Sequence, residues 1–390
     1  MDYWTAVDAI YNVTLSLSFF TFMFLIFYIG RKGFKAGNKY GGVSSIICGV
    51  CFLIFGYYNS IVRFYPYPYN GFMVWWIGII LLVNLIFSTQ IKREKRNMGM
   101  ENQDTNLGGG KKSALRRYVE RMTKENPYSE EITFKMELIR KSFHLTGLLL
   151  VLAYFGFFSF LYPVTLIIND SVIELIHNIK PAYELIWGDI SLYPYATGYT
   201  GLTLGSVPLA VVGLTMMALI GALMFALISD LIRIIWGPEY SVFNFLTKSM
   251  LRNKEKNAAG PQIYIITGFI FSYMLYMAGI LHILAVFSGI LIACLSDAAA
   301  ALIGRRYGKH KIKVRSQDTK SVEGFLAGVI VAYLIGLIVI GPVYAIIGAI
   351  IFYITDYFPI YTADNILNPI FIPLGIQIFI ILLGLPVGWF

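Results

Sequence analysis

The chain is 390 residues long, and 57% of its residues are hydrophobic and 16% aromatic. With a mean hydropathy of +0.67, it holds more apolar surface than a water-soluble domain of this length can bury, which excludes a soluble protein. The formal net charge of +9 calls for no nucleic-acid partner, because cytoplasmic loops of membrane proteins are themselves rich in Lys and Arg. We therefore expect the lipid bilayer to be the main partner.

Apolar windows of about 20 residues, the length that crosses a bilayer, predict an all-α polytopic integral membrane protein with about ten transmembrane helices. His282 separates the sixth span from the seventh, and Gly341-Pro342 separates the eighth from the ninth. The predicted spans are 13–30, 42–62, 72–90, 145–168, 207–232, 263–281, 283–303, 325–341, 343–360 and 369–388.

The distribution of Lys and Arg predicts the orientation of the chain in the membrane. With the N-terminus outside, the inward segments 31–41, 91–141, 233–262 and 304–320 hold four, thirteen, five and seven basic residues. Only Arg63 and Lys180 then lie outside. Ten spans place the C-terminus outside as well. The expected location is the plasma membrane in a prokaryote and the endoplasmic reticulum in a eukaryote.

Three parts of different character follow one another along the chain. Residues 1–90 form an N-terminal three-helix membrane region in which we find no chemical motif. Residues 91–136 form a polar, basic cytoplasmic linker, for which contact with anionic headgroups or solvent is expected. Residues 137–390 form a membrane domain of about seven helices, and all the candidate chemistry lies there, at the cytoplasmic ends of its helices.

The first candidate cluster, Glu137 to Gly147, leads into the fourth predicted span. On a helix, Arg140, His144 and Gly147 share one face. The cations Arg140 and Lys141 and the His144 imidazole, at the membrane entrance, suit a triphosphate ligand and its proton transfers. The alternative is that both cations are ordinary flanking charges and that His144 only fills the interface.

The second cluster extends from Asp297 to Gly324. Asp297, Ala301, Gly304 and Gly308 step by four, three and four residues, so they line one helical face that a ligand could approach closely. Seven cations between Arg305 and Lys320 would cradle a polyphosphate. Asp297 is costly at the end of an apolar span unless it binds a metal or pairs with a cation. The glycines could instead serve helix packing.

Further polar groups lie at the same predicted membrane face. Asp230 and Arg233 close the fifth span, and Arg252 precedes the sixth. Asp364 and Asn365 open the tenth span in a segment without Lys or Arg. These two residues could form a metal or hydroxyl site. They could equally cap the last helix ahead of Pro369.

The order of these motifs resembles the CTP-dependent lipid kinase family that includes dolichol kinase, phytol kinase and the yeast-type diacylglycerol kinase. The resemblance covers roughly residues 137–375. The family's Arg-Lys-x-x-His-x-x-Gly element matches Arg140, Lys141, His144 and Gly147. Its Asp-x-x-x-Ala-x-x-Gly-x-x-x-Gly-Lys element matches Asp297, Ala301, Gly304, Gly308 and Lys309. Its Lys-Ser-x-x-Gly element matches Lys320, Ser321 and Gly324, and its Asp-Asn pair matches Asp364 and Asn365.

The resemblance implies transfer of the γ-phosphoryl group of CTP to the hydroxyl of a membrane lipid. Extra N-terminal spans, which dolichol kinases also carry, favour a polyprenol or dolichol acceptor and a step in lipid metabolism that forms dolichyl phosphate. In this hypothesis Asp297 and Asp364 hold Mg²⁺, and His144 or an aspartate accepts the hydroxyl proton. The expected nucleotide and phosphate contacts are Arg140, Lys141, Arg252, Gly304, Arg305, Arg306, Gly308, Lys309, Lys320, Ser321, Glu323 and Gly324.

Other classes of function remain as alternatives. CTP-dependent cytidylyltransferases that make CDP-lipids share the Asp-to-Lys-Ser region, and Glu323 matches their pattern, but their Lys-Arg, Lys-Asp, His-Gly-Gly and Asp-Arg elements are not found in this chain. A transporter would place polar residues at mid-membrane and repeat its halves, which the sequence does not show. A membrane scaffold would tolerate loss of Asp297. The oligomeric state, including a homo-oligomer, stays open.

Overall fold

The computed structural model describes residues 3–63, 69–101, 113–124, 134–142, 147–152, 154, 207–247, 256–313, 319–358 and 362–389. Helices dominate these residues, and the one sheet they contain is a two-stranded antiparallel hairpin. The prediction of an all-α polytopic membrane protein is therefore confirmed.

Seven helices of the described residues are long and apolar enough to cross a membrane. The helix that begins at Ile283 continues without a break through three labelled pieces. The seven are α1 (Tyr3–Lys35), α2 (Lys39–Val62), α3 (Tyr69–Glu101), α8 (Val207–Ile235), the continuous α11 (Ile283–Leu291), η5 (Ile292–Ser296) and α12 (Asp297–Tyr307), α13 (Val322–Ile340), and α15 (Asp364–Leu383).

Two shorter helices cover further predicted spans, namely α10 (Pro261–Met277) and α14 (Pro342–Tyr357). The two short separations between spans that the sequence predicts are present. His282 caps the start of α11, and Gly341, with a φ of 94°, separates α13 from α14. Most of the predicted span 145–168 lies outside the described residues. The count of ten spans and the placement of both termini outside therefore stay predictions.

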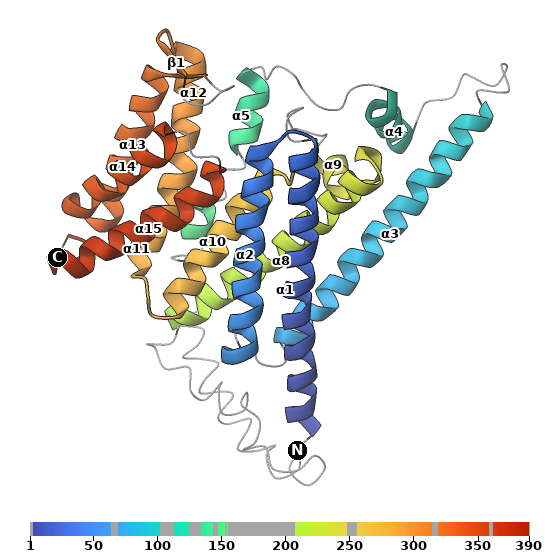
Figure 1. Ribbon diagram of the computed structural model, residues 1–390, viewed down its shortest axis with the longest axis horizontal. Coiled ribbons are helices and arrows are strands. Elements are labelled where there is room, and N and C mark those ends of the chain that lie inside the picture. Colours follow the sequence, from blue (N-terminus) through green and yellow to red (C-terminus); the bar gives the residue numbers. More distant parts are fainter. Residues whose placement is uncertain are drawn as a thin grey trace.

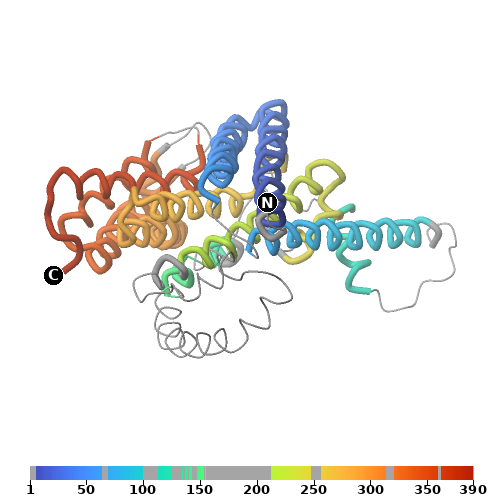
Figure 2. Tube along the Cα trace, turned by 90° about the horizontal axis from the view of Figure 1, so that it is seen from below, coloured from blue at the N-terminus to red at the C-terminus, as the bar shows by residue number. Residues whose placement is uncertain are grey.

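The helices are arranged around an antiparallel pair formed by α1 and α2, with α8 and α10 packed beside it (Figure 1). On one side, α11 to α15 form a group of their own, and on the other α3 diverges from the rest, as the view from below also shows (Figure 2). The largest buried cluster joins Phe22, Phe52, Leu223, Phe269 and Phe287 from five different helices.

Large apolar side chains are also exposed on the outside of the predicted spans. Trp75 of α3, Ile338 of α13 and Ile381 of α15 are 67%, 74% and 71% exposed. Apolar side chains exposed to this extent along several long helices indicate a lipid environment.

The last helix begins earlier than the sequence predicts. The predicted span starts at Pro369, but α15 starts at Asp364 and contains both Pro369 and Pro373. Pro373 has no N–H to donate to the carbonyl of Pro369, and the Ser272 hydroxyl of α10 donates to that carbonyl instead. The prolines also pack closely on neighbouring helices, because a Cβ on Gly268 would lie 3.0 Å from Pro369, and one on Gly289 would lie 2.5 Å from Pro373.

Part of the predicted polar linker is helical. Helix α3 extends through the basic segment to Glu101, and α4 (Ala114–Lys124) packs Tyr118, Val119 and Met122 beside Ile91 of α3. The Tyr118 hydroxyl donates to the carbonyls of Pro238 (3.0 Å) and Ser241 (3.2 Å), in and after the short helix η3 (Pro238–Tyr240) that leads to α9 (Val242–Thr247).

We expect Gly289→Ala to destabilise the protein by about 1–3 kcal/mol, because the added methyl group would overlap Pro373 in a packed interface. The measurement is the thermal midpoint of the detergent-solubilised protein. Gly78→Ala in α3 is the matched control, since a Cβ there meets nothing within 4 Å. Equal midpoints for the two variants would contradict the packing of α11 on α15.

Candidate functional site

Two of the sequence motifs meet at the start of α12, where Asp297 is the first residue. The Lys141 ammonium of α5 (Phe134–Ser142) forms an ion pair with the Asp297 carboxylate. A Cβ on Gly147 would overlap the Cys294 side chain, so the chain after α5 lies directly against η5. Because η5 is a π-helical turn immediately before Asp297, one extra residue in the turn reorients the helix face there. This pairing explains how an aspartate is tolerated inside the long apolar helix Ile283–Tyr307, and not at its end as the sequence predicts.

Glu137 is buried and contacts one arginine of each of the same two helices. Its side chain is only 2% exposed, and its carboxylate lies 3.5 Å from the Arg140 guanidinium and 3.1 Å from that of Arg305. Arg140 and Arg305 were predicted to bind phosphates, and no role was predicted for Glu137. Its signal in the sequence was the spacing of three residues before Arg140, which places both on one helical face.

The predicted glycine face of α12 is covered by the next segment of the chain. A Cβ on Gly304 would lie 2.7 Å from the Ser321 hydroxyl, and one on Gly324 would lie 2.6 Å from the Cα of Gly304. Gly308 likewise abuts Ser321. The alternative that these glycines serve helix packing is therefore supported. Their assignment to nucleotide binding stays a prediction.

A hairpin connects the two helices that pack through these glycines. Strand β1 (Lys311–Lys313) pairs with β2 (Thr319–Ser321), and the Ser321 hydroxyl then accepts a hydrogen bond from Gly324 N (3.1 Å), which caps α13. The Glu323 carboxylate contacts His310 Nδ1 at 2.7 Å and accepts from His310 N at 3.2 Å. Glu323 thus fixes the start of the hairpin to the first turn of α13.

The hairpin positions Lys320 over a buried carboxylate that the sequence analysis did not identify. The Lys320 ammonium contacts the Asp356 carboxylate and donates to its main-chain carbonyl at 3.0 Å. Asp356 lies in the last turns of α14 and is 1% exposed, and its Oδ2 atom has no hydrogen-bond partner. Asp356 was missed because it sits in an apolar window without any motif around it.

Three aspartates act on the charge of Lys320. Burial by itself lowers the pKa of this lysine, but the carboxylates of Asp356, Asp364 and Asp297 outweigh that effect and raise the pKa above its usual value. Lys320 therefore stays protonated at neutral pH. Lys320 thus contacts Asp356 directly, and the charges of Asp364 and Asp297 act on it as well.

Asp364 lies in the first turn of α15, where a carboxylate is favoured by the helix dipole. The helix is capped by Ala363 without a side-chain hydrogen bond, so the alternative that Asp364 or Asn365 is the N-cap is wrong. The Tyr40 hydroxyl of α2 donates to Asp364 Oδ1 at 3.3 Å. Residues 1–90 therefore contribute to this site, which the absence of motifs there did not suggest.

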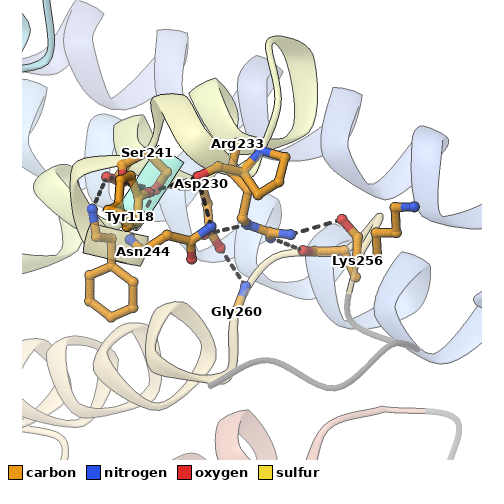
Figure 3. A network of polar contacts seen from close by, with 11 residues as sticks. Tyr118, Asp230, Arg233, Ser241, Asn244, Lys256 and Gly260 are labelled. Atoms are coloured by element: carbon orange, nitrogen blue, oxygen red, sulfur yellow. Dashed lines mark hydrogen bonds and ion pairs between the residues drawn. The ribbon is translucent and has the colours of Figure 1, made fainter. Parts of the chain in front are cut away.

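Asp230 and Arg233 form a buried clamp at the entry of α10, and both side chains are 0% exposed (Figure 3). The Arg233 guanidinium lies 3.0 Å from Asp230 and donates to the carbonyls of Lys256 (2.8 Å) and Ala258 (2.6 Å). Asp230 Oδ2 accepts from Gly260 N at 2.6 Å. These contacts give the pair a structural role.

The remaining predicted residues are exposed or lie outside the described part. Arg306 and Lys309 are exposed at the end of α12, and the Arg306 guanidinium lies 5.3 Å from the centre of the Tyr307 ring. His144 and Arg252 lie outside the described residues, so their predicted roles are untested.

Magnesium would need ligands beyond the protein. Among the described residues, no group of three or more His, Cys, Asp or Glu side chains is close enough to hold a metal ion. Carboxylate oxygens are the ligands that Mg²⁺ prefers, and this ion is commonly held by one or two carboxylates together with substrate phosphates. Asp297 and Asp364 fit that limited role, and the unpartnered oxygen of Asp356 adds a donor of the same chemistry.

We expect Asp230→Asn to destabilise the protein by about 3–5 kcal/mol, because it leaves the buried Arg233 charge without its partner. Thermal unfolding in detergent measures the change. Asp8→Asn is the control, since Asp8 pairs with Arg63 at a partly exposed site where loss costs about 0–1 kcal/mol. If Asp230→Asn unfolded at the control's temperature, the clamp would not have the structural role assigned to it.

Comparisons with known proteins identify no relative of this chain. Comparison of the chain with protein-family models finds no match, and no curated protein or solved structure shows significant similarity to it. Any proposal about function therefore rests on the resemblance of the four motifs and on the geometry of the site.

Proposed function

We propose that the protein is a CTP-dependent lipid kinase that transfers the γ-phosphoryl group of CTP to the hydroxyl of a membrane isoprenoid alcohol of the polyprenol or dolichol type. The observation that carries the proposal is the ion pair between Lys141 and Asp297, which joins two motifs 156 residues apart. Two elements that resemble parts of one nucleotide site are thereby neighbours in space.

The charges of the site suit phosphoryl transfer, which depends mainly on positioning the phosphates and neutralising their charge. Lys141 and Lys320 each form an ion pair with an aspartate, which a bound triphosphate would partly replace as the partner. Nearby carboxylates keep Lys320 charged by raising its pKa. Arg306, in the last turn of α12, and Lys309, just after it, are exposed. Asp297 and Asp364 would hold Mg²⁺, and the ion would supply further charge neutralisation.

The acceptor would reach the site from the lipid phase. The outer surfaces of α13 and α15 are apolar, so an isoprenoid chain can lie against them with its hydroxyl at the helix ends, which the positive-inside rule places at the cytoplasm. The alcohol oxygen forms the new bond to the γ-phosphorus, the bond to the β-phosphate oxygen breaks, and CDP leaves. The hydroxyl proton passes to Asp297 or His144.

The alternative, a cytidylyltransferase, rests mainly on Glu323. Since Glu323 binds both the ring and the main-chain nitrogen of His310, its presence has a structural reason that either enzyme would share. The kinase therefore remains the better-supported proposal.

We expect γ-labelled CTP, and not α-labelled CTP, to label a polyprenol when the purified protein is incubated with Mg²⁺ in detergent. Asp297→Asn should lower this transfer by at least about 100-fold, because it weakens both metal binding and charge balance. The control Asp8→Asn, at a site remote in sequence from every motif, should retain activity. Label from the α-phosphate alone, on a phospholipid acceptor, would establish the cytidylyltransferase instead.

A charge exchange separates a structural role of the ion pair from a chemical one. Lys141→Asp and Asp297→Lys should each lower the thermal midpoint, because each leaves two like charges facing one another. The double variant should regain most of the midpoint and yet stay at least about 100-fold below wild-type activity, since the carboxylate is no longer at position 297. Recovery of activity together with stability would show that the pair only holds α5 on α12.

A further inference from the structure

A second candidate site lies in the N-terminal part of the protein, where α1 and α3 diverge beside α8 (Figure 1). A cavity of about 550 Å³ is present there, within the range of roughly 300–1,000 Å³ that small-molecule sites occupy. Its walls come from all three helices, and none of the residues of the candidate active site lines it.

The cavity is apolar and opens toward the lipid. Phe22 and Ile228 are buried in its wall, while Leu81, Leu85 and Trp236 are more than half exposed at its edge. In a membrane, side chains exposed in this way contact the bilayer, so a lipid chain can enter sideways without crossing water.

One polar side chain in the lining has an unmet hydrogen-bonding need. Asn84 of α3 is 2% exposed, and its Nδ2 atom donates to the Ile80 carbonyl at 2.8 Å. Its Oδ1 atom is buried and has no hydrogen-bond partner. In the hydrocarbon region no bulk water can donate to this oxygen, and a bound molecule with a hydroxyl group would supply a donor.

The other polar groups of the lining define which molecule fits. The Ser18 hydroxyl donates to the Thr14 carbonyl and that of Thr21 donates to the Leu17 carbonyl, both at 2.8 Å, so these oxygens offer only lone pairs to a ligand. Among the residues that the structure describes, no Lys or Arg lines the cavity. An anionic headgroup would therefore find no cation here, whereas a hydroxyl would find acceptors.

We infer that this cavity binds a long-chain neutral alcohol, whose hydroxyl donates a hydrogen bond to Asn84 Oδ1 and whose chain lies along the apolar wall. The inference rests on the cavity and on Asn84, and it holds independently of the proposed kinase reaction. If the kinase proposal is also correct, the N-terminal helices carry a binding site for a lipid of the acceptor's class.

The test uses a diazirine-bearing long-chain alcohol with the full-length protein in nanodiscs, and mass spectrometry locates the labelled peptides. Labelling is expected in α1, α3 and α8, and the unlabelled alcohol should compete for it. The methyl ether of the same chain, which cannot donate, should compete about tenfold more weakly. No nucleotide is present, so the result does not depend on kinase activity.

Two variants make the test specific. Asn84→Leu should reduce labelling by the alcohol about tenfold and remove its advantage over the ether. Leu81→Trp should fill the cavity and abolish labelling, whereas the matched control Leu82→Trp, on the same helix but outside the lining, should leave it unchanged. Equal competition by alcohol and ether in the wild type, or label confined to other helices, would overturn the inference. An unfolded Asn84→Leu protein would leave the ether comparison and the Leu81 variant as the deciding results.

Discussion

Buried and half-buried carboxylates in apolar helices dictate much of this structure, because each one requires a cation or donor before it can leave water. Asp297 is matched by Lys141, Asp356 by Lys320, and Asp230 by Arg233. In the first two cases the cation comes from a different helix or strand, so the pairs fix α5 on α12 and the hairpin on α14. The arrangement of the candidate site is therefore a consequence of charge burial as much as of helix packing.

Hydropathy predicted the seven long apolar helices because the lipid requirement acts on every window of about 20 residues, wherever it lies in the chain. Helix α15 begins at Asp364, before the approximate span limit of Pro369, and the Ser272 hydroxyl that satisfies the Pro369 carbonyl comes from another helix, which the local sequence does not reveal. Similarly, the sequence required a partner for Asp297 but could not identify Lys141, and Asp356 carried no motif that would distinguish it from its apolar neighbours.

The glycine pattern of α12 shows a different limit of sequence reasoning. The spacing correctly places Gly304 and Gly308 on one face, but spacing alone does not say what approaches that face. The close approach of Gly324 and Ser321 occupies it with the chain itself. A nucleotide would then be held by side chains at the end of α12 and on the hairpin, such as Lys309 and Lys320, and less by bare main chain. This makes charge, and not backbone cradling, the feature that would select a triphosphate.

The N-terminal helices are tied to the candidate site by specific contacts. The Tyr40 hydroxyl binds Asp364, and the Ser44 hydroxyl accepts a hydrogen bond from Ala363 N at 2.8 Å, so the first turn of α15 is held by α2. Helix α2 in turn packs along α1, which forms one wall of the Asn84 cavity. Residues 1–90 are thus part of the framework of the site, although no motif in them indicated this role.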